Sequence, residues 1–270
     1  MTRAASRLRL YVEVARSTFR RVTTYRGATF AGVVTNTVFG FILAYVLLAV
    51  FNERGTVGSF DATDAVTYVF VTQALLMVVG VFGNLEMAER IRTGDVAVDL
   101  CRPYDFQGWW LAVHYGKAPF YFVFRGIPPY LLGALVFHLR LPPDVPTFLA
   151  FLVSTALAVG VAGAYGFILQ SLAFWILDVR GPNQIGWIAA QFFAGTYLPL
   201  VLFPAWLEAV ARVLPFASMI QFPVEVFLGK HTGPNLAGVF ALQITWLILL
   251  VAIGRMLLAR ATQRLVIQGG

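Results

Sequence analysis

Long apolar runs with few or no charges alternate along the chain with short segments that carry most of the charges. A transmembrane helix needs about 20 consecutive, mostly apolar residues. Six runs meet this requirement, and we expect spans at about 30–51, 65–85, 118–137, 148–170, 185–203 and 236–258. The third run is the least regular, because Arg125 and Pro128-Pro129 interrupt it. No Asp or Glu lies within any of the six runs. The pattern predicts an all-α, polytopic membrane protein with six transmembrane helices.

Residues 1–29, which precede the first run, follow a different pattern. Apolar residues recur there at mixed three- and four-residue steps, with arginines between them. This spacing is typical of a basic amphipathic helix that lies in the membrane interface. A plain positively charged anchor is the alternative. We expect an N-terminal interfacial helix over 1–29 and a membrane domain over 30–270.

The segment 204–229 is apolar but broken. Glu208, Arg212 and Glu225 would each be costly in a lipid-exposed helix, and Pro215 and Pro223 would interrupt one. Irregular backbone at membrane depth is tolerated only where it is buried in protein or faces water. We therefore expect two short helices joined by a turn, which together form a re-entrant helical hairpin on the outer side of the membrane.

Composition excludes a soluble domain. Hydrophobic residues make up 59% of the 270 residues and charged residues only 12%, against about 25% charged residues in globular proteins. The net charge of +7 indicates membrane topology rather than nucleic-acid binding. With the N-terminus inside, 15 of the 20 bases fall in cytoplasmic segments. We expect both termini in the cytoplasm. Since 18 bases are arginine, a bias typical of GC-rich bacterial genomes, we expect a bacterial cytoplasmic membrane.

Several kinds of chemistry have no motif in the chain. No P-loop is present, so we expect no ATPase activity in this chain. His114, His138 and His231 are far apart and lack the spacing of a zinc site. We expect no catalytic residue, no metal site and no cofactor here. The absence of acids from the runs also argues against a transporter driven by protons or sodium ions.

The segment 86–105 carries charges of both signs, and it contains residues that are typical of helix starts and helix ends. Gly94 is expected to end one helix, and Asp95 to cap the next over 96–102. Pro103 restricts the residue before it and ends the unit. A short charged helix at the cytoplasmic tip of two spans suits docking to a soluble partner. An ordinary solvated loop is the alternative.

A further short helix is expected directly after this unit. Asp105 can cap a helix over 106–115. Trp109 and Trp110 in that helix suit the membrane interface.

The order of these parts resembles the membrane subunit of type-2 ABC exporters. Those subunits have an interfacial helix, six spans, a coupling helix between the second and third spans, and re-entrant helices before the sixth. Ile91-Arg92-Thr93-Gly94-Asp95 followed by Leu100-Cys101-Arg102-Pro103 is similar to the "I-x-x-G…L-x-R-P" signature of the viologen-exporter-like group of small bacterial permeases. The Gln268-Gly269-Gly270 ending is also similar. Cys101 replaces an aliphatic residue, and we interpret it as a small buried hydrophobe.

The resemblance implies a mechanism for the permease domain 30–270. A separate ATPase subunit, which holds ATP and Mg, would bind the coupling segment 86–105. Closure of the ATPase dimer would switch a cavity between two permeases, either a homodimer or a heterodimer with a related permease. Such a complex exports its cargo, and multidrug efflux is one such activity. The residues implied in docking are Arg90, Arg92, Asp95, Asp99 and Arg102 as polar contacts, with Gly94 and Pro103 setting the shape of the segment.

Two other classes of protein remain open at this stage. One is a non-transport membrane protein, such as a scaffold or an assembly factor. The other, a secondary transporter, is disfavoured by the absence of acids from the runs.

Arg125 lies about seven residues into the third run, which places it ~10 Å deep. Its side chain could snorkel to the cytoplasmic head groups. A pairing or substrate role is the alternative.

Uncharged residues of the spans offer a weak candidate substrate path. Asn36 and Gln73 lie on the first and second spans, and hydrogen bonds between helices are the simpler interpretation. Phe192, Phe193 and Tyr197 could line an apolar path, or they could face lipid or the core.

Overall fold

The computed structural model describes residues 3–24, 26–80, 82–176 and 178–268, without the side chains of 3–7, 54 and 264–268. The Gly269-Gly270 ending therefore lies outside the described residues. The elements are α1 (Arg3–Val22), α2 (Arg26–Arg54), α3 (Ala62–Val79), α4 (Glu86–Arg92), α5 (Val96–Leu100), α6 (Phe106–Tyr121), the π-helical turn η1 (Phe122–Gly126), α7 (Ile127–Val136), α8 (Val145–Ser171), the 3-10 turn η2 (Leu172–Phe174), α9 (Arg180–Phe193), the 3-10 turn η3 (Leu200–Leu202), α10 (Ala205–Val213), α11 (Gln221–Phe227) and α12 (Gly233–Gln268).

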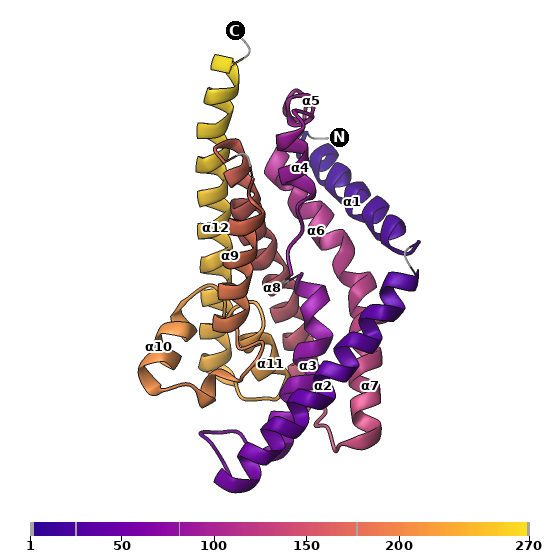
Figure 1. The fold of residues 1–270 in the computed structure, drawn as a ribbon, viewed down its shortest axis with the longest axis vertical. Helices are drawn as coiled ribbons and strands as arrows, with labels where there is room; N and C mark the ends of the chain where they lie inside the picture. Colours follow the sequence, from indigo (N-terminus) through magenta and orange to yellow (C-terminus); the bar gives the residue numbers. More distant parts are fainter. Residues whose placement is uncertain (1–2, 25, 81, 177, 269–270) are drawn as a thin grey trace.

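The protein is an all-helical polytopic membrane protein, as the pattern predicted. Among the described residues, five helical stretches are long and apolar enough to cross a membrane. They are Arg26–Glu53, Ala62–Val79, Phe106–Val136, Val145–Phe174 and Gly233–Gln263. Figure 1 shows these helices as one elongated bundle, with α4 and α5 at one end and α10 and α11 at the other.

The fifth predicted span, 185–203, differs from the structure. α9 has 14 residues and ends at Phe193, so it is about 21 Å long. Gly195 follows in the left-handed conformation, with φ +77°. A Cβ atom there would lie 2.3 Å from Oε1 of Gln221 and 2.5 Å from Oη of Tyr68. The turn requires glycine, because a buried tyrosine and a buried glutamine occupy the space that a side chain would need.

The second span begins earlier than the prediction of 65–85 and ends sooner. Asp61 caps α3 by accepting a 2.7 Å hydrogen bond from the backbone N–H of Asp64, and the Asp64 carboxylate accepts from the N–H of Asp61. The helix ends at Gly80, which has φ +75°. Asp64 therefore lies inside α3, which corrects the prediction that no acid falls within a span.

The third span is one continuous helical stretch, and the separate helix predicted over 106–115 is its first part. α6 passes into the π-helical turn η1, which holds Arg125, and then into α7. Pro128 and Pro129 lie in the first turn of α7, directly after the π-helical turn.

α1 lies against α6 and brings the basic N-terminal segment onto the bundle. Gly116 of α6 permits this contact, because a Cβ atom there would lie 2.4 Å from the backbone oxygen of Ala15. Figure 1 shows α1, α4, α5 and the last turns of α12 at the same end of the molecule.

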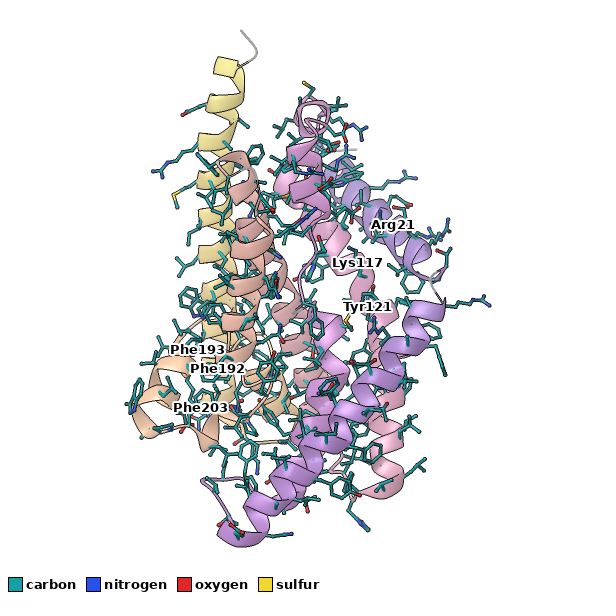
Figure 2. The ribbon with its side chains drawn as sticks, viewed as in Figure 1. Arg21, Lys117, Tyr121, Phe192, Phe193 and Phe203 are labelled. Atoms are coloured by element: carbon teal, nitrogen blue, oxygen red, sulfur yellow. The ribbon has the colours of Figure 1, made fainter. Side chains whose placement is uncertain are left out.

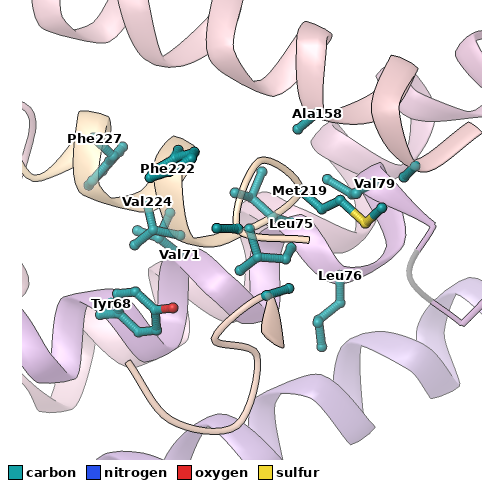
Figure 3. Packing of buried hydrophobic residues seen from close by; sticks show 14 of the residues in the cluster. Tyr68, Val71, Leu75, Leu76, Val79, Ala158, Met219, Phe222, Val224 and Phe227 are labelled. Atoms are coloured by element: carbon teal, nitrogen blue, oxygen red, sulfur yellow. The ribbon is translucent and has the colours of Figure 1, made fainter. Parts of the chain in front are cut away.

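The main hydrophobic core surrounds α3, which packs against α2 on one side and α8 on the other. Figure 3 shows Leu75 and Val79 of α3 close to Ala158 of α8 and Met219, which precedes α11. The broken segment 204–229 contributes to this core through α11, while α10 lies at the edge of the bundle (Figure 1).

Candidate coupling site

The first helix of the coupling segment, α4, is fixed by a residue from a distant span. The side-chain oxygen of Gln170, near the end of α8, accepts hydrogen bonds from the N–H groups of Met87 (3.0 Å) and Ala88 (3.4 Å). The first N–H groups of a helix have no partner within it. Gln170 satisfies two of them, so the start of α4 is attached to the end of α8.

Gly94 separates the two helices of the segment, as predicted. Its φ is +83°, a conformation that favours glycine at the end of a helix. The next prediction needs correction, because Asp95 makes no side-chain cap. Asp95 has helical backbone angles, whereas a capping residue is normally extended. Its carboxylate instead accepts a 2.9 Å hydrogen bond from Thr93.

An ion pair joins α4 to α5. Arg90 donates two hydrogen bonds to Asp99, Nε to Oδ2 at 2.5 Å and Nη2 to Oδ1 at 3.0 Å. This two-bond geometry is the strongest that a guanidinium makes with a carboxylate. Asp99 is only 7% exposed. The sequence suggested both residues as contacts for a partner, but the structure shows them bound to each other.

A small apolar core lies beneath the segment. Met87 of α4 and Val96 of α5 are buried together with Phe106 and Phe167. The rings of these two phenylalanines lie 6.1 Å apart, edge to face. Asp105 caps α6, as predicted, by accepting from the N–H of Gly108 at 2.6 Å. The segment therefore rests on the start of α6 and the end of α8.

The outer side of the segment is exposed. Arg92 pairs with Glu89 on the surface of α4, and Val98 of α5 is 60% exposed. Cys101, which directly follows the last residue of α5, is exposed rather than buried. Five predicted contact or shape residues of the segment are exposed, namely Arg92, Gly94, Asp95, Arg102 and Pro103.

Three helices meet at Glu86, the first residue of α4. Arg21 of α1 donates to Glu86 at 3.0 Å and 3.4 Å, and Nζ of Lys117 of α6 lies 3.7 Å from Oε2 of Glu86. Figure 2 shows Arg21 and Lys117 on neighbouring helices. Partial burial opposes ionisation of Glu86, but the two cations outweigh it and lower its pKa. Sequence reasoning did not find this cluster, because its members are up to 96 positions apart.

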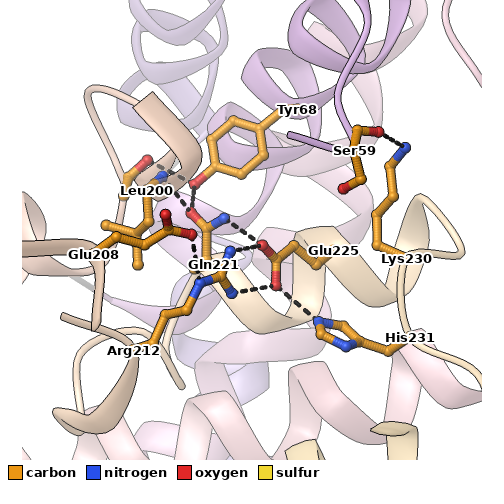
Figure 4. A network of polar contacts seen from close by, with 10 residues as sticks. Ser59, Tyr68, Leu200, Glu208, Arg212, Gln221, Glu225, Lys230 and His231 are labelled. Carbon is orange, nitrogen blue, oxygen red and sulfur yellow. Dashed lines mark hydrogen bonds and ion pairs between the residues drawn. The ribbon is translucent and has the colours of Figure 1, made fainter. Parts of the chain in front are cut away.

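A second polar network lies at the opposite end of the bundle. Glu225 of α11 is 2% exposed. It accepts hydrogen bonds from Arg212 (2.7 and 3.0 Å) and Gln221 (2.8 Å), and its Oε2 lies 2.8 Å from Nε2 of His231 (Figure 4). Burial opposes ionisation of Glu225, but these partners outweigh it and lower its pKa to about 2. The charges that made 204–229 look costly in lipid are paired inside the protein.

The network continues to α3 and to the end of α9. The hydroxyl of Tyr68 lies 2.5 Å from Oε1 of Gln221 and 2.8 Å from the backbone oxygen of Gly195. The backbone N–H of Leu200 also donates to Oε1 of Gln221, at 3.2 Å. Figure 4 shows Gln221 between Tyr68 and Glu225. One glutamine thus holds three segments that are far apart in the sequence.

A buried carboxylate anchors the adjoining loops. Asp64 is 2% exposed, and its oxygens lie 2.6 Å from Nζ of Lys230 and 3.1 Å from Nε of Arg140. Lys230 also donates to the backbone oxygen of Ser59 at 2.6 Å, and Arg140 pairs with Asp61. The two bases tie the loops after α7 and α11 to the start of α3.

Comparison with known families identifies the class of protein. The family model described as ABC-2 family transporter protein matches residues 34–269. The chain belongs to the ABC-2 transporter family. No curated protein matches the sequence. The predicted resemblance is therefore confirmed at the level of an ABC-2 transporter membrane protein.

In this ABC-2 transporter protein, the polar residues of the first two spans contact each other. Nδ2 of Asn36 donates to the backbone oxygen of Gln73 at 3.2 Å, and both side chains are buried. This is the hydrogen bond between helices that was the simpler interpretation.

Arg125 lies between the third span and α2. Its guanidinium carbon is 5.6 Å from the ring centre of Tyr121, within range of a cation–π contact. A Cβ atom at Gly32 of α2 would lie 1.7 Å from Nη2 of Arg125, so a glycine makes room for the guanidinium. Within the described part of the chain, no carboxylate forms an ion pair with Arg125.

The aromatic residues at the end of α9 contact one another and the segments that follow. Phe192 lies 5.2 Å from Phe193 and 5.2 Å from Phe203, measured between ring centres, and all three are labelled in Figure 2. Phe193 stacks at 6.2 Å on Phe216. The hydroxyl of Tyr197 donates to Gln191 at 2.8 Å. Among the described residues, no group of His, Cys, Asp or Glu is arranged to hold a metal ion.

Proposed function

We propose that this ABC-2 protein is the permease subunit of an ATP-driven exporter in a bacterial cytoplasmic membrane. A separate ATPase subunit, carrying ATP and Mg, docks on the exposed side of α4 and α5. A second permease, identical or related, completes the translocation path. This chain contributes no catalytic residue and transmits the movement of its partner.

The construction of the α4–α5 segment carries this proposal. The segment is braced internally by the Arg90–Asp99 pair and by its own apolar core. It is anchored to α8 through Gln170 and to α6 through Phe106. Its outer side presents Val98 and Arg102. A force that the ATPase applies to the exposed side of the segment would therefore move the ends of two spans instead of deforming a loop.

The arrangement of the helices supports a cytoplasmic location for the α4–α5 segment. α1, with its many arginines, lies at the same end as α4 and α5, and so do the last turns of α12 (Figure 1). Positive charge is enriched on the cytoplasmic side of membrane proteins. A reporter fused after Gly58, in the loop at the opposite end, should read extracytoplasmic.

The exposed apolar surface of α2 and α9 supports the proposal that a second permease binds. α2 presents Phe30, Val38 and Phe39, each at least half exposed, and α9 presents Ile185 and Ile188. Part of this surface faces lipid. The remainder lines the path that is shared with the partner permease.

The test is to co-purify the chain with its ATPase and to measure ATP hydrolysis and transport together. Arg102→Glu and Val98→Asp change only exposed side chains, so both variants should insert normally but lose coupling between hydrolysis and transport. Arg260→Glu is the matched control, because Arg260 is an exposed arginine in the C-terminal part of α12. Absence of an ATPase complex, or equal activity in all three variants, would contradict the proposal.

A further inference from the structure

The third and fourth spans separate from each other in the half of the bundle away from α4. α6 packs against α8, but beyond η1 the chain continues as α7, which packs mainly against α2 and α3. Two glycines favour this path. A Cβ atom at Gly126 would lie 2.9 Å from the backbone oxygen of Ala74, and one at Gly133 would lie 2.5 Å from the ring of Phe70. α8 packs instead against α11 and α12.

A cavity of about 540 Å³ occupies the space that this divergence leaves. Its apolar lining comes from five elements, with Val71 and Ala74 of α3, Phe122 of η1, Ile127 of α7, Phe148 and Phe151 of α8, and Phe227 of α11. The rings of Phe151 and Phe227 lie 5.1 Å apart, edge to face. Figure 3 shows Val71 and Phe227 on neighbouring elements.

The polar groups of the lining are already engaged. Asp144, which carries the only charge among the lining residues, caps α8 by accepting from the N–H of Thr147 at 2.7 Å. The hydroxyl of Tyr130 donates to the backbone oxygen of Arg140 at 2.8 Å. A buried water molecule typically needs two to four polar partners. The cavity suits hydrocarbon rather than water.

The mouth of the cavity is apolar and exposed. Leu141, Val145 and Ile127 line it and are all exposed, and Leu131 and Leu135 extend the same kind of surface along α7. Because the mouth lies between two membrane-spanning stretches, it opens toward the bilayer. Apolar surface of this kind, inside a membrane, is covered by lipid chains.

We propose that this cavity binds one acyl chain of a membrane phospholipid. Its volume falls within the range of about 300–1,000 Å³ that ligand sites occupy. An empty cavity of this size would destabilise the folded protein, because the side chains that line it would lack contacts on one side. A helix with its side chains is about 10 Å wide, so a volume of about 540 Å³ would hold only about 7 Å of its length. The cavity therefore suits a single flexible chain rather than a helix from a second copy. A chain bound here would set the spacing between α7, α8 and α11.

The experiment places the full chain in nanodiscs that contain phosphatidylcholine with a diazirine on its acyl chain. After illumination, mass spectrometry locates the labelled residues. We expect the label to concentrate on Phe122, Phe148 and Phe151, which line the cavity, above its level at Leu135, which is more exposed but lies outside the cavity. A distribution that simply follows exposure would overturn the proposal.

Cavity-filling variants provide the second arm. Ala74→Phe should lower labelling of the cavity residues by about fivefold, because the added ring takes the space of the chain. Leu135→Phe on the exposed side of α7 is the matched control and should leave that labelling unchanged. If Ala74→Phe does not fold, Val71→Phe makes the same test from the next turn of α3.

Other occupants give distinguishable results. Photo-crosslinks from Leu141 to a second copy of the chain, with no lipid label in the cavity, would show that protein fills the site. Loss of binding of a hydrophobic dye in the Ala74→Phe variant, without any change in lipid labelling, would show that the cavity is a cargo site. Either result overturns the assignment to a phospholipid.

Discussion

The two ends of the helical bundle use their charged residues in different ways. At the end that holds α10 and α11, the carboxylates of Asp64 and Glu225 are each 2% exposed and each contact at least two partners. At the α4–α5 end the ionic contacts are more exposed: Arg90 pairs with Asp99, and Glu86 contacts Arg21 and Lys117. Other charged residues there, such as Arg92 and Arg102, lie on the surface.

This difference separates charges that shape the protein from charges that a partner can reach. Buried ion pairs contribute little net stability over apolar packing, but they are costly to break, because removing one partner leaves the other unpaired. The α10–α11 end is therefore sensitive to single substitutions and fixed in shape. The α4–α5 end tolerates surface changes, and it is the end where changes would act through binding.

Glu225→Leu should have the largest effect on stability. The substitution leaves Arg212 and His231 without their buried acceptor and should destabilise the protein by about 3–5 kcal/mol. Thermal unfolding in detergent measures the loss. Glu208→Gln, which changes a more exposed acid bound to the same arginine, is the control and should cost under about 1 kcal/mol. Equal losses in the two variants would remove the distinction between buried and accessible charges.

Acid should weaken the α10–α11 end through the same residue. The pKa of Glu225 is lowered from 4.5 to about 2 in the folded protein. A lowered pKa contributes stability that is fully present above the unfolded value and is lost as the pH falls through the folded value. We expect this contribution, about 3 kcal/mol, to disappear between about pH 4.5 and 2. Unfolding midpoints across that range should fall more steeply for the wild type than for Glu225→Leu.

Asp99→Ala should have an intermediate effect, about 1–2 kcal/mol, because Asp99 is buried while its partner Arg90 is partly exposed. Charge exchange in the double variant Arg90→Asp with Asp99→Arg should recover part of the loss. Arg92→Ala, which breaks only the surface pair with Glu89, is the control. If the double variant is no better than the single one, the pair does not brace the segment.

Arg102→Glu should have the smallest effect on stability, under about 0.5 kcal/mol, because exposed substitutions are rarely costly. Its effect should appear only when the ATPase is present. A large loss of stability in the isolated chain would mean that Arg102 supports the fold and is not free for a partner.

Features set by a few neighbouring residues could be predicted from the sequence. Gly94 ends α4 because its φ is positive, and Asp105 caps α6 through the residue three positions later. Both depend on local backbone geometry. The all-helical membrane fold followed from the length of the apolar runs, which reflects the thickness of the bilayer.

Features set by distant residues could not be predicted in the same way. The run 185–203 is apolar enough for a span, but Gly195 turns the chain where Tyr68 and Gln221 occupy the space. The Arg90–Asp99 pair depends on the angle between α4 and α5. Single-sequence patterns contain no signal for such contacts, so Asp99 looked available for docking and Glu225 looked misplaced.

The bond between Gln170 and α4 has a consequence for the order of synthesis. Gln170 lies 83 positions after Met87, whose N–H it accepts. While the ribosome is still making the third span, the start of α4 lacks this acceptor. The coupling segment reaches its final form only after the fourth span has been translated and inserted. A partner that recognises this form would therefore bind only chains that extend beyond Gln170 and would not bind shorter products.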